Sequence, residues 1–120
     1  LRSDVAQIHA LRLKHRFLGI YYPRLNTFIL KVQAKITSMS EAGKNMTLSQ
    51  AKLDEAKTTL ETAKELAENS IAGFEGIEPA KYSVQRQQAL EARDQAKEAR
   101  AKFVDTIKLL KDTLKLMRAA

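Results

Sequence analysis

The 120-residue sequence has no cysteine and no tryptophan, only two prolines and only four glycines. The absence of cysteine excludes disulfide bonds and thiolate metal sites, although it does not indicate a compartment. The longest uncharged run among the first forty residues, Phe17 to Pro23, has seven residues, whereas a membrane-spanning helix needs about 20 apolar ones. Alanine, leucine, lysine and glutamate are abundant instead, as is typical of long helices. The composition therefore predicts an all-α domain.

One apolar stripe dominates the first third of the sequence. Its members recur at alternating spacings of four and three, so they fall on one side of an α-helix. They are Leu18, Tyr22, Leu25, Ile29, Val32, Ile36 and Met39. Ile8, Leu11 and His15 continue the same phase toward the N-terminus. The pattern predicts one long helix over about residues 4–40. Pro23 removes a backbone hydrogen bond within it, which predicts a kink near that residue and not a complete break.

A second apolar line lies on nearly the opposite side of this helix, before the proline. Its members are Ala6, Ala10, Leu13, Phe17 and Ile20. A surface helix normally shows one apolar stripe. Two stripes mean that this half of the helix is covered on two sides, that the kink re-aims it, or that one stripe faces a partner outside the chain.

Two further helices follow from the turn signals. Gly43 can take the left-handed conformation common just after a helix, and Thr47 with Gln50 has the form of a capping box. Alanine-rich lines then predict helices over about residues 48–72 and 80–118. The inner line expected for the last helix is Ala89, Ala92, Ala96, Ala99, Phe103, Ile107, Leu110, Leu114 and Met117. The whole chain is then a single domain, a three-helix up-down-up bundle resembling an antiparallel coiled coil.

The net charge of +7 is unevenly distributed. Residues 1–40 carry a net charge of +6, residues 41–82 carry −3, and residues 83–120 carry +4. A basic first helix with interleaved aromatics suits an anionic polymer or a membrane surface. The simpler interpretation is a solvated face that also pairs with the acidic middle segment.

The candidate interaction surface combines the second apolar line with the neighbouring positive charge. Its residues are Leu13, Phe17, Ile20, Tyr21, Arg12, Arg16 and Arg24. The apolar members suit a protein partner or a second copy of the chain. The basic members suit nucleic acid or an anionic lipid surface.

The sequence predicts no catalytic residues, no cofactor and no metal site. His9 and His15 lie six residues apart and do not share a helix face. A Glu-x-x-His motif, which carboxylate-bridged di-metal bundles use, is absent. Ser and Thr lie mainly at expected helix ends and on helix surfaces, without a base beside them. We therefore expect a protein that is not an enzyme and has no small-molecule substrate.

Three segments carry a resemblance to a known class of protein. They are the basic helix around Arg16 and Arg24, the Ala-Lys-Leu-Asp-Glu-Ala-Lys run at residues 51–57, and the Ala-Arg-Asp-Gln-Ala-Lys-Glu-Ala-Arg run at 92–100. Over residues 12–118 the chain resembles uncharacterised alanine-rich three-helix domains of predicted secreted or envelope-associated bacterial proteins. The resemblance implies an extracytoplasmic setting and no particular activity. We expect a structural or protein-interaction module, the alternative being an anionic partner bound through the first helix.

Overall fold

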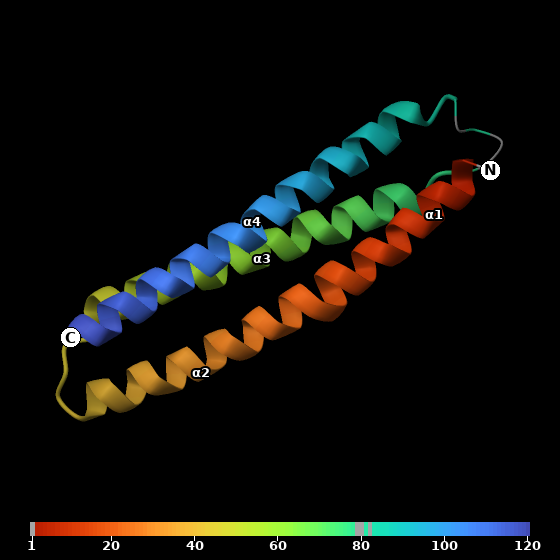
Figure 1. Ribbon diagram of the computed structural model, residues 1–120. Helices are drawn as coiled ribbons and strands as arrows, with labels where there is room; N and C mark the ends of the chain where they lie inside the picture. The colour runs from red at the N-terminus through yellow and green to blue at the C-terminus, as the bar shows by residue number, and fades with distance from the viewer. Residues whose placement is uncertain (1, 79–80, 82) are drawn as a thin grey trace.

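The computed structural model describes residues 2–78, 81 and 83–120, which form helices and connections with no strand among them (Figure 1). The prediction of an all-α fold is confirmed. The elements in chain order are α1 (Arg2–Leu13), the π-helix η1 (Lys14–Tyr21), α2 (Tyr22–Glu41), α3 (Thr47–Glu75) and α4 (Arg86–Ala119).

Three long helices result, because α1, η1 and α2 follow one another without a break. We refer to these three elements together as the first helix, residues 2–41. The first helix runs along the molecule, α3 returns beside it, and α4 runs in the first direction again (Figure 1). The Cα atoms span 64 × 20 × 14 Å, so the molecule is a rod. α3 packs against both other helices, whereas the first helix and α4 touch each other sparsely.

The turn between α2 and α3 differs in one respect from its prediction. Gly43 has a φ of +92°, as expected of the residue just after a helix. Thr47 does not cap α3, because the helix begins at Thr47 itself and its backbone N–H donates to Asn45 Oδ1 at 3.1 Å. The Gln50 side chain bonds to another helix instead of reaching back to the turn. The predicted capping box is therefore wrong.

The connection between α3 and α4 also differs from its prediction. α3 continues past its expected end to Glu75, and α4 begins at Arg86, well after its expected start. Gln85 explains the late start, because its side-chain amide joins the two ends of the loop. It accepts a hydrogen bond from the Glu78 backbone N–H at 2.8 Å and donates one to the Gly76 carbonyl at 3.2 Å. These bonds satisfy backbone groups that no helix reaches.

The π-helical segment accounts for the two apolar lines of the first helix. Phe17 is only 1% exposed, and Tyr22, five residues later, also packs on the core. The Tyr22 backbone N–H donates to the Phe17 carbonyl, which is the π-helical pattern. The additional residue in this turn changes the phase of the stripe by about 100°. The line that ends at Phe17 and the stripe that continues from Tyr22 therefore both face the bundle.

All three residues predicted to extend the inner stripe toward the N-terminus, Ile8, Leu11 and His15, are in fact exposed. Ile8 is 46% exposed and Leu11 65%, while Ala6 and Ala10 of the second line are buried. The phase changes within η1, so counting back from the stripe in steps of 3.6 residues selects the wrong side of α1. The first helix is continuous through Pro23. The predicted kink there stays a prediction.

α3 and α4 share the most extensive interface, because small residues let their backbones approach closely. Ser70 is fully buried and donates its hydroxyl to the Ala92 carbonyl. A Cβ atom added to Gly73 would lie 2.9 Å from the Cβ of Ala92. Larger buried side chains, such as Leu53 and Leu110, fill the core farther along the pair. The close approach at Ala92 leaves no room for a further methyl group.

Gly73→Ala is expected to destabilise the fold by about 1–3 kcal/mol, although alanine is the better helix former by about 1 kcal/mol. The added methyl meets the Cβ of Ala92, which is fixed to a helix backbone and cannot turn away. Gly19→Ala is the matched control, because a Cβ there meets nothing closer than 3.8 Å. This control should stabilise the fold by about 0.5–1 kcal/mol. Urea unfolding measures both changes, and a stabilising Gly73→Ala would contradict the close approach.

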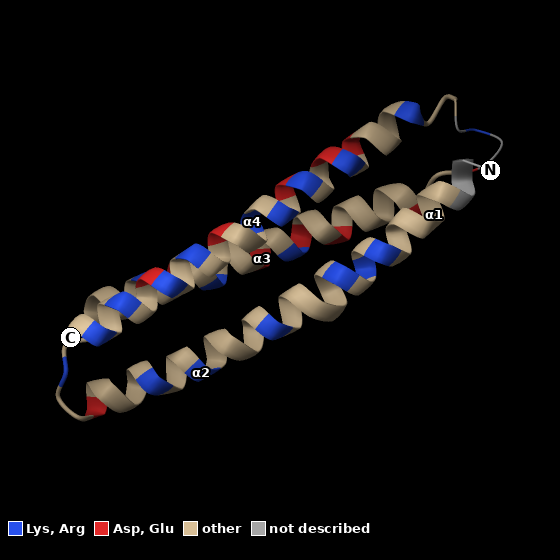
Figure 2. Cartoon of the chain, in the orientation of Figure 1, with Lys and Arg blue, Asp and Glu red and all other residues tan. Residues whose placement is uncertain are grey.

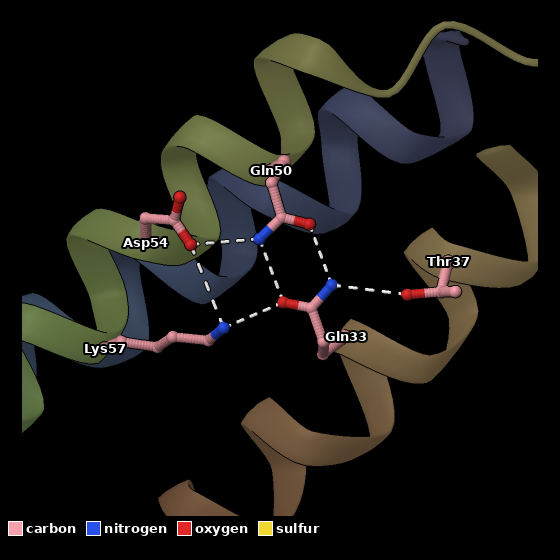
Figure 3. Close-up of polar contacts among 5 residues, drawn as sticks. All are labelled: Gln33, Thr37, Gln50, Asp54 and Lys57. Atoms are coloured by element: carbon pink, nitrogen blue, oxygen red, sulfur yellow. Dashed lines mark hydrogen bonds and ion pairs between the residues drawn. The ribbon is translucent and has the colours of Figure 1, made fainter.

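A polar network fixes α2 against α3 (Figure 3). Gln33 Nε2 donates to Gln50 Oε1 at 2.8 Å, and Gln50 Nε2 donates to Gln33 Oε1 at 2.9 Å. Lys57 donates to Gln33 Oε1 at 2.8 Å, and Gln50 Nε2 also donates to Asp54 Oδ1 at 2.9 Å. Sliding either helix would break both bonds of the amide pair, so the pair specifies one register. The network thus joins the first helix to α3 and includes no residue of α4.

Candidate functional site

Three cavities follow one another along the seam between the first helix and α4. They have volumes of about 490, 550 and 420 Å³. The first lies beside α1, the second beside the junction of η1 and α2, and the third beside the end of α2. Because the first helix and α4 run in the same direction, the cavities form one line, which we call the seam groove. The residues at its centre are Ile20, Tyr21, Arg24, Leu25, Arg100, Phe103, Val104 and Ile107.

The seam groove is open because the first helix and α4 both pack on α3 and only sparsely on each other. Val104 is 44% exposed and Ile107 is 42% exposed, and both line the central cavity. Tyr21 faces them from the first helix and is also exposed. Contiguous exposed apolar side chains with a charged rim are typical of a binding surface.

Two aromatic rings, those of Tyr21 and Phe103, line the central cavity, and the buried ring of Phe17 packs against both. The ring centres of Phe17 and Phe103 lie 5.3 Å apart in a stacked arrangement. Tyr21 meets Phe103 edge-on, with the ring centres 5.6 Å apart. Phe17 and Phe103 are only 1% and 2% exposed, so Tyr21 supplies most of the accessible aromatic surface. Aromatic clusters of this kind are rigid, so the floor keeps its shape.

The charges that line the seam groove all have one sign. Its Lys and Arg residues are Arg24, Lys35, Lys44, Arg86, Arg93, Arg100 and Arg118. Of the described residues that line its three cavities, none is an Asp or a Glu. Figure 2 shows Lys and Arg from the end of α1 through α2, with an acidic position at the end of α2. By contrast, a cavity along α3 is lined by Asp54 and Glu55.

The positive charge of the first helix is partly paired on the side that faces α3. Lys14 Nζ lies 3.4 Å from a carboxylate oxygen of Glu75. The Tyr22 hydroxyl donates to Glu61 at 2.7 Å, and this hydrogen bond, with a smaller effect of burial and nearby carboxylates, raises the pKa of Tyr22. In the described part of the chain, Arg24 and Arg100 have no acidic oxygen within ion-pair distance. Carboxylates of α3 thus contact one side of the first helix and do not line the groove.

The structure divides the predicted interaction surface. Ile20, Tyr21 and Arg24 line the centre of the seam groove, and Leu13 lines the cavity beside α1. Phe17 was expected at the surface and lies in the core instead, because the π-helical turn rotates its side of the helix toward the bundle.

The two remaining predicted residues, Arg12 and Arg16, are exposed. They lie at spacings of three and four from His9 and Ile20, which both line the groove. The two arginines therefore continue its basic rim along the first helix.

The α4 side of the groove was missed by the sequence analysis. Ile107 was expected in the inner line of the last helix, but it is exposed, and Thr106 beside it is fully buried. Thr106 and Thr113 donate their hydroxyls to the carbonyls four residues earlier, at 2.8 Å each. Ala92, Ala99, Thr106 and Thr113 are spaced by seven residues. This heptad of small residues was the signal that could have placed Ile107 on the groove side.

The arrangement offers a trough for a bound partner, and the described part of the chain adds two observations. In that part of the chain no three His, Cys, Asp or Glu side chains gather to hold a metal ion. None of its helices is both long enough and apolar enough to span a bilayer. What the groove offers is an apolar floor between two rows of positive charge.

No protein-family model, curated protein or solved structure matches this chain. The resemblance to alanine-rich envelope-associated domains therefore stays a hypothesis.

Proposed function

We propose that the chain is a non-enzymatic protein-interaction module that binds a protein partner in the seam groove. The observation that carries this proposal is the exposed apolar floor between the first helix and α4, with Tyr21, Val104 and Ile107 at its centre. Burying apolar side chains of this size contributes about 25 cal/mol per Å² removed from water. A helix laid in the groove would complete a four-helix arrangement around the same core.

The alternative function is binding of an anionic partner, either nucleic acid or anionic lipid, through the first helix. The observation that favours it is the net positive charge of that helix and the exposed Arg12 and Arg16. This alternative leaves the apolar floor without a role, and phosphate contacts use exposed ridges of charge more than an apolar trough. We therefore rank it second. An extracytoplasmic setting, which the resemblance implies, is compatible with either function.

Site-specific photocrosslinking in cells that naturally make the protein tests the proposed function. A benzophenone amino acid at Val104, which is exposed in the groove, is expected to form a covalent adduct with another protein. The same amino acid at Thr58, exposed on α3 outside the groove, is the control and should give several-fold less adduct. Adducts with lipid or nucleic acid at Val104 would favour the alternative function. Equal adducts at both positions would contradict the groove.

A further inference from the structure

The seam groove has the shape of a site for a helix. Its three cavities lie beside residues 5–13, 20–25 and 35–39 of the first helix, so it extends over about 50 Å at 1.5 Å per residue. The two helices that bound it run in the same direction, so its walls follow one axis (Figure 1). Grooves of this kind accept an amphipathic helix that inserts side chains at i, i+3 or i+4, and i+7.

Both walls of the groove are positively charged, so we expect its occupant to have acidic residues on both sides of an apolar stripe. Arg24 comes from the first helix and Arg100 from α4, and both line the central cavity together with Tyr21 and Phe103. A guanidinium group binds a carboxylate through two parallel hydrogen bonds. An occupant with Asp or Glu on both sides of its apolar stripe would pair with both walls and relieve the repulsion between them.

A second copy of this chain does not offer this combination. The exposed residues of α3 include Glu61, Glu65 and Glu68, but the only large apolar side chain described as exposed on that helix is Leu48, at its start. The first helix does present exposed apolar side chains such as Leu11, but its positive charge would be repelled by the groove. α4 presents exposed apolar side chains such as Val104 together with acidic residues, but its nine Lys or Arg outnumber its five Asp or Glu, so its net charge of +4 would also be repelled by the groove.

We infer that the seam groove binds an acidic amphipathic helix of a different protein, with a large apolar side chain seated on Tyr21 and Phe103 between Arg24 and Arg100. This inference rests on the proposed function, since it names the partner class for the same groove. A planar membrane surface or a nucleic acid would meet the basic rim without filling the trough. These two partners are outcomes of the test below.

The test is a titration of the ¹⁵N-labelled chain with three peptides of about 28 residues, followed by NMR. The first has four Leu-Glu-Gln-Leu-Glu-Ala-Glu repeats, the second has lysine at each glutamate, and the third has serine at each leucine. We expect the acidic leucine peptide to bind at least about tenfold more tightly than its lysine twin. The amide signals that shift should be those of residues 20–25 and 100–107. The serine peptide should bind at least about tenfold more weakly than the leucine one.

Charge-reversal variants locate the acid preference on the protein. The double variant Arg24→Glu, Arg100→Glu is expected to weaken binding of the acidic leucine peptide about tenfold or more. Lys108→Glu is the matched control, because Lys108 is exposed on α4 and lines none of the three cavities. It should change the affinity less than about twofold. All three side chains are exposed, so the helical circular dichroism spectrum should be unchanged.

The outcomes separate this inference from the proposed function. If the lysine peptide binds in the groove as tightly as the acidic one, the groove binds helices but the acidic partner is wrong. If no leucine peptide binds at millimolar concentration, both proposals fail. Equal binding of the serine peptide, or of phosphatidylglycerol vesicles in preference to phosphatidylcholine ones, would assign the groove to anionic surfaces. A dimer in light scattering that the acidic peptide dissociates would assign it to a second copy.

Discussion

Phe17→Ala is expected to lower the free energy of unfolding by about 3–5 kcal/mol. Phe17 is the largest fully buried side chain of the first helix, and its ring stacks on Phe103 at 5.3 Å. Truncation removes this contact and also the packing against Tyr21, whose ring centre lies 5.9 Å away. A cavity remains, since the surrounding helices can relax only partly. Urea unfolding at 25 °C, followed by circular dichroism, measures the loss.

Phe28→Ala is the matched control for this change. Phe28 lies on the same helix but is 40% exposed, so its truncation should cost about 1 kcal/mol or less. Had the line through Phe17 faced a partner outside the chain, as the sequence allowed, the two truncations would cost similar amounts in the free protein. Equal losses would therefore contradict the inward orientation of Phe17.

Deletion of Gly19 is expected to change the free energy of unfolding by no more than about 1 kcal/mol, whereas deletion of Ala34 should cost about 3 kcal/mol or more. Gly19 lies in the π-helical segment, which holds one residue more than an α-helix needs. Removing it converts the turn to α-helix and leaves Phe17 and Ile29 on the same face. Ala34 is exposed in regular α-helix, so its loss rotates Ile36 out of the core by about 100°.

Urea unfolding measures both deletion variants, and the unchanged chain is the reference. A large loss of unfolding free energy on deleting Gly19 would contradict the interpretation that the π-helical turn serves only to change the phase of the apolar stripe. A small loss on deleting Ala34 would mean that the helix slides or unwinds locally at little cost, and it would contradict the single register specified by Gln33 and Gln50.

The all-α fold was predictable because its signal is repeated many times. The stripe from Leu25 to Met39 spans four turns in one phase, and every one of its members packs on the core. The side of α1 was not predictable from the same rule. A single residue in η1 changes the phase, and alanines at positions 6 and 10 signal burial more weakly than the exposed Ile8 and Leu11 do. Counting apolar residues by size therefore selects the wrong face.

The positions of the helix ends were harder to predict, because they depend on side chains that bond to residues far away in the sequence. Gln50 fits a capping box by spacing, but it finds a stronger pairing with Gln33 on another helix. Gln85 delays the start of α4 through bonds to Gly76 and Glu78 at the other end of the loop. Local helix propensity predicts neither of these interactions, because each depends on which segments the fold brings together.

The sequence pattern identified part of the candidate surface. It misplaced Phe17 because the π-helical turn changes the phase of the apolar stripe. Ile20, Tyr21 and Arg24 could be identified because aromatic, apolar and basic residues alternate there. Arg100 and Val104 could not, because only the fold shows that α4 borders the same groove. The periodicity of one helix does not indicate which residues of a second helix lie beside it.

The up and down course of the chain also has a mechanical consequence. α1 begins at one end of the 64 Å rod and α4 finishes at the other (Figure 1). Tension between these ends would act parallel to every helix, so packed side chains such as Leu53 and Leu60 would have to slide past their neighbours together instead of separating one by one. The seam groove runs along the flank between these ends, from Val5 near one to Arg118 near the other. A molecule pulled at both ends would thus resist by shear along the helices that form the groove.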